Sequence, residues 1–80
     1  MTTALPANED YAKAILSIFS SSHVRSGQTL KADRVREAFQ AGRMGRPIDY
    51  EDALQYAVDH NWLMVQAGMI RLTSAGYAQI

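Results

Sequence analysis

The chain contains no cysteine, which excludes both disulfide bonds and thiolate metal sites. Its apolar stretches are also short, and none approaches the roughly 18 residues that suggest a transmembrane helix. Residues 1–9 lack the basic and apolar regions of a signal peptide. With these features missing, we expect a cytoplasmic protein that has no membrane anchor.

The chain lacks a net charge as well, because eight basic residues balance eight acidic ones. The charges are nevertheless divided along the sequence. Residues 25–46 carry six cations and two acids, whereas residues 47–80 carry one cation and four acids. The middle segment is therefore positive by about four charges and the C-terminal segment negative by about three. We expect an anionic partner to approach the middle segment.

With 80 residues, the chain has the length of one small domain. Hydrophobic residues make up 48% of it, which is enough for a packed core and is not typical of a disordered segment. Folding therefore needs no cofactor, and we expect none. The sequence predicts a flexible N-terminus over residues 1–7 and one domain over residues 8–80.

Two segments in the first half have the apolar spacing of amphipathic helices. The first is predicted to begin at Asn8, a suitable N-cap residue, and to end in the serine run 20–22. The second spans about 32–40, and Gly42 ends it. Between these helices, Leu30 is predicted to point into the core from a short extended link.

A third helix follows a loop that is rich in glycine and arginine. Asp49 is its predicted N-cap, and Asp52 takes the third helical position of a capping box. The helix is predicted to continue to about His60. Apolar side chains repeat at helical spacing through this segment, at positions Tyr50, Ala53, Leu54, Ala57 and Val58.

Two short apolar strands around an Ala67-Gly68 turn are predicted after the third helix. Their residues alternate between apolar and more polar types, so we expect each strand to bury one face. Thr73 is predicted to cap a short final helix that runs to Gln79. The side chains expected to be buried are Leu63 and Val65 in the first strand and Ile70 and Leu72 in the second.

The order of three helices and a hairpin, with segments 62–65 (WLMV) and 72–76 (LTSAG), resembles the winged helix-turn-helix family of bacterial transcription regulators. In that family, an aromatic-leucine pair, two strands, a leucine-threonine pair and a glycine follow the third helix. The resemblance covers residues 8–79. It implies an α+β, mainly helical winged helix with a three-helix core, a C-terminal β-hairpin wing and a short final helix. It also implies DNA binding and transcription regulation.

In the family, outward side chains of the third helix reach base edges, and the wing reaches the minor groove or the backbone. The matching wing positions are residues 66–69. The charged residues at the helix positions are all acidic, so they would face the DNA phosphates. This departure from the family pattern favours a second hypothesis, in which the domain binds another protein and does not bind DNA. The matching helix positions are Glu51, Asp52, Gln55, Tyr56 and Asp59.

The first hypothesis is therefore a module that binds double-stranded DNA through phosphate contacts from the second helix and the 42–47 loop. Arg43 and Arg46 flank the start of the third helix, where free amides favour an anion. Two alternatives stay open: a solvated loop, and ordinary ion pairs of the helix arginines with Asp33 and Glu37. The predicted nucleic-acid-binding residues are Arg34, Arg36, Arg43, Arg46, Gln55 and Arg71.

The second hypothesis is a protein-interaction module that does not bind DNA. The acidic third helix would meet a basic surface, and Tyr56 with the methionines would form an exposed apolar patch. The partner would be a basic or apolar surface on another protein. Under the DNA hypothesis, binding to a two-fold operator would instead require another partner or a homodimer formed through the first or the final helix. The predicted residues of this surface are Glu51, Asp52, Tyr56, Asp59, Met64 and Met69.

Catalytic and metal-binding patterns are sparse. His23 follows a run of serines, but serine-histidine chemistry requires a spatial arrangement and a third orienting group. His23 and His60 are distant in sequence and do not have a familiar metal-ligand spacing. The chain also lacks a phosphate-binding glycine motif. We therefore expect a protein that is not an enzyme and holds no metal.

Overall fold

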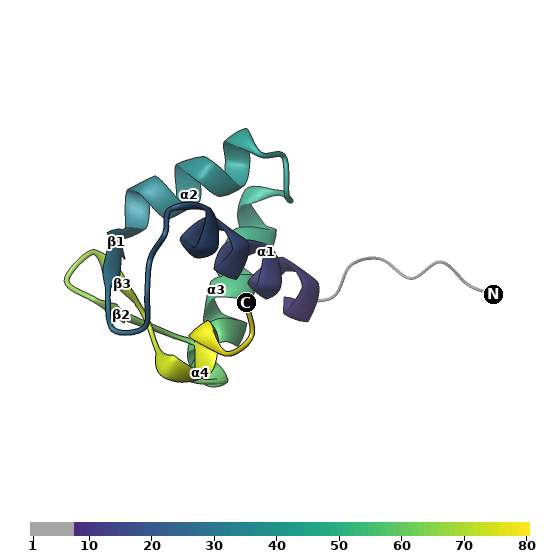
Figure 1. Cartoon of the computed structure of the whole chain (residues 1–80). Helices are drawn as coiled ribbons and strands as arrows, with labels where there is room; N and C mark the ends of the chain where they lie inside the picture. The colour runs from purple at the N-terminus through teal and green to yellow at the C-terminus, as the bar shows by residue number, and fades with distance from the viewer. Residues whose placement is uncertain (1–7) are drawn as a thin grey trace.

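Three main helices, a three-stranded antiparallel sheet and a short final helix make up residues 8–80, the part of the chain that the computed structural model describes (Figure 1). The predicted flexible segment, residues 1–7, lies outside the described residues. The α+β, mainly helical fold class is therefore confirmed. The elements are α1 (Asn8–Ser21), β1 (Thr29–Lys31), α2 (Ala32–Ala41), α3 (Pro47–Asp59), β2 (Leu63–Gln66), β3 (Met69–Leu72) and α4 (Ser74–Tyr77).

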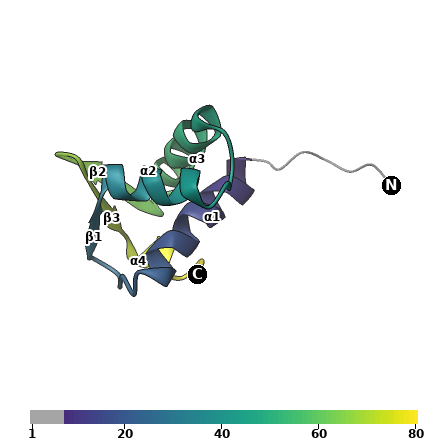
Figure 2. The ribbon, with the colours of Figure 1, turned by 90° about the horizontal axis from the view of Figure 1, so that it is seen from above.

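The three main helices meet around the ring of Phe39. This side chain of α2 is fully buried, and its ring centre lies 6.3 Å from that of Tyr11 in α1 and 5.4 Å from that of Tyr50 in α3. Tilted ring pairs at such distances add to the stabilisation that burial provides. Burial also raises the pKa of the Tyr50 hydroxyl. Figure 2 shows the sheet at one side of this helical core.

The start of α3 differs from the prediction. The helix begins at Pro47, and Arg46 rather than Asp49 is the N-cap residue. Proline is favoured at the first helical position because no partner in the helix requires its missing N–H group there. Asp49 instead occupies the third helical position, where its carboxylate accepts a hydrogen bond of 2.8 Å from the Arg46 backbone N–H. The predicted capping role of Asp52 is therefore wrong, because Asp49 fills that position. Asn8 is likewise the first residue of α1 rather than its cap.

The hairpin of β2 and β3 is confirmed, and β1 adds a strand where the sequence predicts an extended link. β3 lies in the middle, with β1 and β2 antiparallel on either side. Ala67 and Gly68 form the turn with φ values of 50° and 76°, the left-handed pair of a type I′ hairpin turn. The Gly68 carbonyl accepts a 2.9 Å hydrogen bond from the Ala32 N–H, which ties the hairpin tip to the start of α2.

The inner face of the sheet packs on the helices along only part of its length. Leu63, Ile70 and Leu72 are fully buried, as predicted, and Leu30 is partly buried against the same core. The predicted burial of Val65 is wrong, because its side chain is 49% exposed. Val65 lies on an edge strand close to the turn, where the hairpin extends past the helices (Figure 1).

The final helix is capped by Thr73, whose hydroxyl oxygen accepts a 3.0 Å hydrogen bond from the Gly76 N–H. It ends at Tyr77, earlier than predicted. Three helices followed by an antiparallel hairpin are consistent with a winged-helix-like topology. Among residues 8–80, the helices are all too short or too polar to cross a membrane.

Candidate interaction surfaces

The outward side of α3 is acidic. Its exposed residues follow one another at intervals of three or four positions, apart from two adjacent acids, which places them on one side of the helix. We call Ile48, Glu51, Asp52, Gln55 and Asp59 the acidic stripe. Ile48 is 51% exposed at the start of the stripe, and Gln55 Nε2 donates a 2.8 Å hydrogen bond to Asp59 Oδ1 near its end. No basic residue occurs anywhere in α3, so the carboxylates set the sign of this surface.

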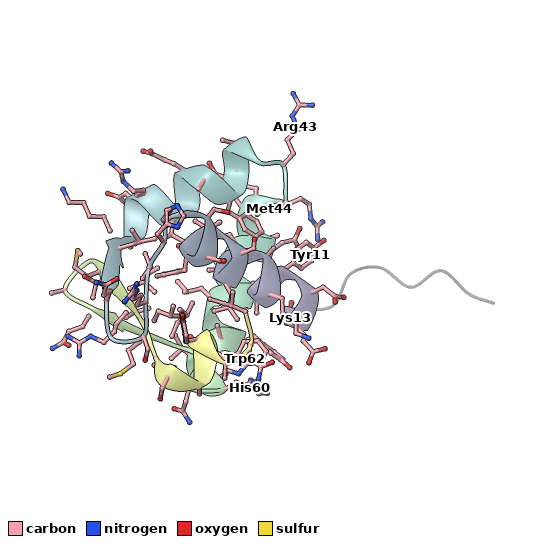
Figure 3. The ribbon with its side chains drawn as sticks, viewed as in Figure 1. Tyr11, Lys13, Arg43, Met44, His60 and Trp62 are labelled. Carbon is pink, nitrogen blue, oxygen red and sulfur yellow. The ribbon has the colours of Figure 1, made fainter. Side chains whose placement is uncertain are left out.

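Tyr56 does not belong to the acidic stripe. It is half-buried, and its ring stacks on His60 at 4.0 Å between centres and meets the edge of Trp62 at 5.7 Å. Figure 3 shows His60 and Trp62 side by side. Burial raises the pKa of the Tyr56 hydroxyl, and the nearby Glu9 carboxylate raises it further. The structure therefore places Tyr56 in an aromatic cluster at the C-terminal end of α3, rather than in the exposed patch with the methionines.

The sheet has a second exposed surface, on the side that faces away from the helices. Antiparallel register places Thr29, Arg71 and Met64 in one row across the three strands, and Lys31, Met69 and Gln66 in the next. Side chains that lie opposite one another in a register point to the same face of a sheet. We call these six residues the outer sheet face.

A hollow of about 320 Å³ opens on the outer sheet face. Met64 is 52% exposed there, and Met69 is half-buried beside Arg71. The structure thus brings together the two methionines of the protein-interaction hypothesis and one arginine of the DNA hypothesis. Thr29 and Lys31 are absent from the predicted sites, because the pairing of residues 29–31 with β3 carries no signal within that segment. The side chains that line the hollow are Thr29, Met64, Gln66, Ala67, Met69 and Arg71.

Arg46 is engaged at the start of α3. Its Nε lies 3.0 Å from Asp49 Oδ2, and its Nη2 lies 3.1 Å from Asp49 Oδ1. These hydrogen bonds lower the pKa of the Asp49 carboxyl and raise that of the Arg46 guanidinium. Asp49 is only 8% exposed, so its carboxylate occupies the helix end where the sequence predicts a phosphate. An incoming phosphate would have to compete with this carboxylate.

The remaining predicted cations differ in their surroundings. Arg36 Nη2 forms a 3.0 Å ion pair with Asp33 Oδ1 on the surface of α2, one of the two alternatives that the sequence left open. Arg34 and Arg43 are exposed and form no ion pair with any residue in the described range 8–80. Figure 3 shows the Arg43 side chain extending away from the domain. These two arginines are available to an external anion.

Another hollow, of about 360 Å³, lies between the end of α1 and α4. Ser20 and His23 both line it, but the lining includes no carboxylate side chain that would orient the imidazole. Within residues 8–80, histidine, aspartate and glutamate do not gather in any group of three or more that could hold a metal ion. The lining residues are Ser20, His23, Val24, Arg25, Tyr77 and Ile80.

No protein-family model, curated protein or solved structure matches this chain. The fold alone does not assign a function, because one fold can carry many functions. The acidic stripe, the outer sheet face and the two exposed arginines are therefore the features on which a functional assignment depends.

Proposed function

We propose that this domain is a winged helix that serves as a protein-interaction module, and that the acidic stripe of α3 is its docking surface. The observation that carries the proposal is the charge of the stripe. Glu51, Asp52 and Asp59 are exposed on the side of α3 that a DNA-binding winged helix would present to bases, and α3 itself carries no cation. The arginine at its N-cap, Arg46, is held by Asp49.

Electrostatics argues against duplex DNA at this surface. Glu51 and Asp59 are eight residues apart, a separation of about 12 Å along the helix. Duplex DNA carries one negative charge per about 1.7 Å of its axis, so three carboxylates would face a dense array of phosphates. Like charges brought together in this way oppose binding. A partner with a basic surface gains attraction from the same three groups.

The stripe also offers an apolar contact. Ile48 precedes Glu51 by one helical turn, and half of its side chain is exposed to solvent. Docking helices commonly combine apolar anchors with charges that select the partner. The partner is therefore expected to present basic residues around an apolar site.

A matched pair of charge reversals tests the proposal. Glu51→Lys reverses a charge in the acidic stripe, and Glu37→Lys makes the same change on the exposed surface of α2. The full chain is cross-linked in the cells that express it, and the attached proteins are identified by mass spectrometry. We expect the wild type and Glu37→Lys to capture the same partner proteins. Glu51→Lys should fail to capture them. Equal capture by both variants contradicts the assignment of the stripe.

Arg34 and Arg43 favour a second candidate, in which the domain contacts DNA phosphates through α2 and the following loop and regulates transcription. Binding to a labelled random-sequence duplex is measured by fluorescence anisotropy between about 50 and 200 mM salt. If the domain binds DNA in this way, the double variant Arg34→Ala with Arg43→Ala should make the binding constant less dependent on salt. The slope of log K against log salt concentration should decrease in magnitude by about two. Arg36→Ala serves as the control, because Asp33 already pairs with that side chain. Absence of binding at the lowest salt excludes this candidate.

A further inference from the structure

The outer sheet face carries the opposite charge to the acidic stripe. Lys31 and Arg71 are its charged residues, and none of its six residues is acidic. Both cations are exposed and form no ion pair within residues 8–80. The domain therefore presents a basic surface on the sheet and an acidic surface on α3, while its net charge is zero.

We propose that the outer sheet face of one copy of this chain docks the acidic stripe of a second copy. The proposal rests on the function proposed above, in which the stripe is a docking surface, and it names the partner. Complementary charge selects this partner, because the sheet supplies the basic residues that the stripe requires.

The distance between the two cations of the outer sheet face is similar to the distance between two carboxylates of the acidic stripe. Arg71 lies opposite Thr29, two residues before Lys31 on the neighbouring strand. Strand rise and strand separation then put Lys31 and Arg71 about 8 Å apart at Cα. Asp52 and Asp59 lie seven residues apart on one side of α3, a separation of about 10 Å. The long side chains of lysine and arginine span the difference.

Apolar groups are complementary as well. Ile48 is exposed at the start of the stripe, and Met64 and Met69 line the hollow of about 320 Å³ on the outer sheet face. Methionine side chains are flexible and polarisable, so they adapt to an incoming aliphatic side chain. An isoleucine beside two carboxylates thus matches a methionine-lined hollow beside two cations.

The two surfaces of one molecule cannot satisfy each other. The inner residues of the sheet, Leu30, Ile70 and Leu72, pack into the core with α3, so the outer face points away from the helices. Docking therefore joins separate copies. Contact between two different surfaces of identical chains is heterologous, and it either closes into a small assembly or continues as a chain.

A charge-swap experiment on the full chain tests the proposal. Lys31→Glu with Arg71→Glu reverses the sheet, and Glu51→Lys with Asp52→Lys reverses the stripe. Sedimentation velocity is recorded from about 10 µM to about 1 mM, a range suited to a modest interface. We expect the wild-type mass to rise to at least twice that of the monomer. Each reversed chain alone should remain monomeric, because both of its surfaces then have the same sign.

The mixture of the two reversed chains is the decisive sample. At equal concentrations, the acidic sheet of one chain meets the basic stripe of the other, and the native acidic stripe meets the native basic sheet. Association should return, and it should weaken as salt screens the charges. Arg25→Glu with Arg34→Glu changes the net charge as much as the sheet reversal does, but at exposed residues outside the outer sheet face. This control should associate like the wild type.

A wild type that stays monomeric over the whole range overturns the proposal, as does a mixture that does not associate. Loss of association in the control also overturns it, because net charge would then explain the effect. These results leave the proposed function standing if partner capture still depends on Glu51. Equal capture by Glu51→Lys and Glu37→Lys instead removes the proposed function itself. Circular dichroism establishes that each variant is folded.

Discussion

The two ends of strand β2 share one alternating pattern but differ in burial. Leu63 at the base is fully buried, whereas Val65, two residues along the same face, is 49% exposed. The base of β2 lies against α3 and α4, whereas its turn end extends past the helices at the edge of the sheet (Figure 1). Ile70, opposite Val65 on the central strand β3, is fully buried. Alternation therefore identifies which side chains share a face, while a covering element decides whether that face is buried.

The base and the tip of the hairpin are also joined to different parts of the domain by hydrogen bonds. At the base, the Trp62 carbonyl accepts hydrogen bonds from the Thr73 N–H at 3.1 Å and from the Thr73 hydroxyl at 2.9 Å. At the tip, the Gly68 carbonyl accepts the bond from the Ala32 N–H, and β1 pairs with the turn end of β3 through Lys31 opposite Met69. The base thus joins β2 to α4, whereas the tip is joined to β1 and the start of α2 through β3 and the turn.

The largest contrast is expected between alanine substitutions on the same face. Leu63→Ala should lower the free energy of unfolding by about 2–5 kcal/mol, because it leaves a cavity in the core. Val65→Ala should change it by only about 0.5 kcal/mol, as is usual for exposed positions. Urea denaturation followed by the fluorescence of Trp62, the single tryptophan, measures both. Similar losses would show that the tip is covered in solution.

Gly76→Ala tests the close approach at the base. A Cβ atom at this position would overlap the Trp62 carbonyl group, which is backbone and cannot rotate away. We expect a loss of about 1–3 kcal/mol or more, the usual cost of overpacking. Thermal unfolding followed by circular dichroism measures the change. Unaltered stability would mean that α4 moves freely away from β2.

Gly68→Ala tests the tip. The substituted Cβ would meet no atom within 4 Å, so its cost arises from the positive φ of 76° alone. We expect a loss of about 1 kcal/mol for a non-glycine residue held in the left-handed region. Gly68→Asn should lose less, because asparagine tolerates this conformation better. Equal losses for alanine and asparagine, measured by urea denaturation, would point to a cause other than φ.

The smallest effect concerns the start of α3, away from the hairpin. Hydrogen bonds from Arg46 lower the pKa of Asp49 in the folded state. The ionised carboxylate therefore stabilises the fold above its unfolded pKa of about 4, and this contribution is lost as pH falls through the folded value. Asp49→Asn should lower the urea midpoint at pH 7, with the difference from wild type shrinking at lower pH. A difference that stays constant with pH would exclude the carboxylate charge as its source.

Local sequence signals located most of the helices and the hairpin, and the errors have local causes. Aspartate is a favoured N-cap, so local preference predicts Asp49 as the cap. Pro47 instead takes the first helical position, which makes Arg46 the cap. Strand β1 has only three residues, and its formation depends on pairing with β3, which lies about forty positions later. A single-segment pattern does not contain that information.

One candidate surface could be predicted from local sequence, and the other could not. The acidic stripe follows from α3 alone, because helical spacing places Glu51, Asp52 and Asp59 on the side opposite the apolar residues. The outer sheet face required the register that sets Lys31 and Arg71 on one side of three strands. The exposure of Arg34 beside the paired Arg36 also emerged only from side-chain positions.

The amino-acid sequence by itself determined the helical segments, the turn at Ala67-Gly68 and the sign of the charge on α3. These properties depend on neighbours within a few residues, through backbone preferences and side-chain periodicity. The tertiary structure decided which hairpin residues are buried, how Arg46 is engaged, and which cations share a surface. Burial and surface charge depend on which distant segments pack together, and that packing is set by the whole core.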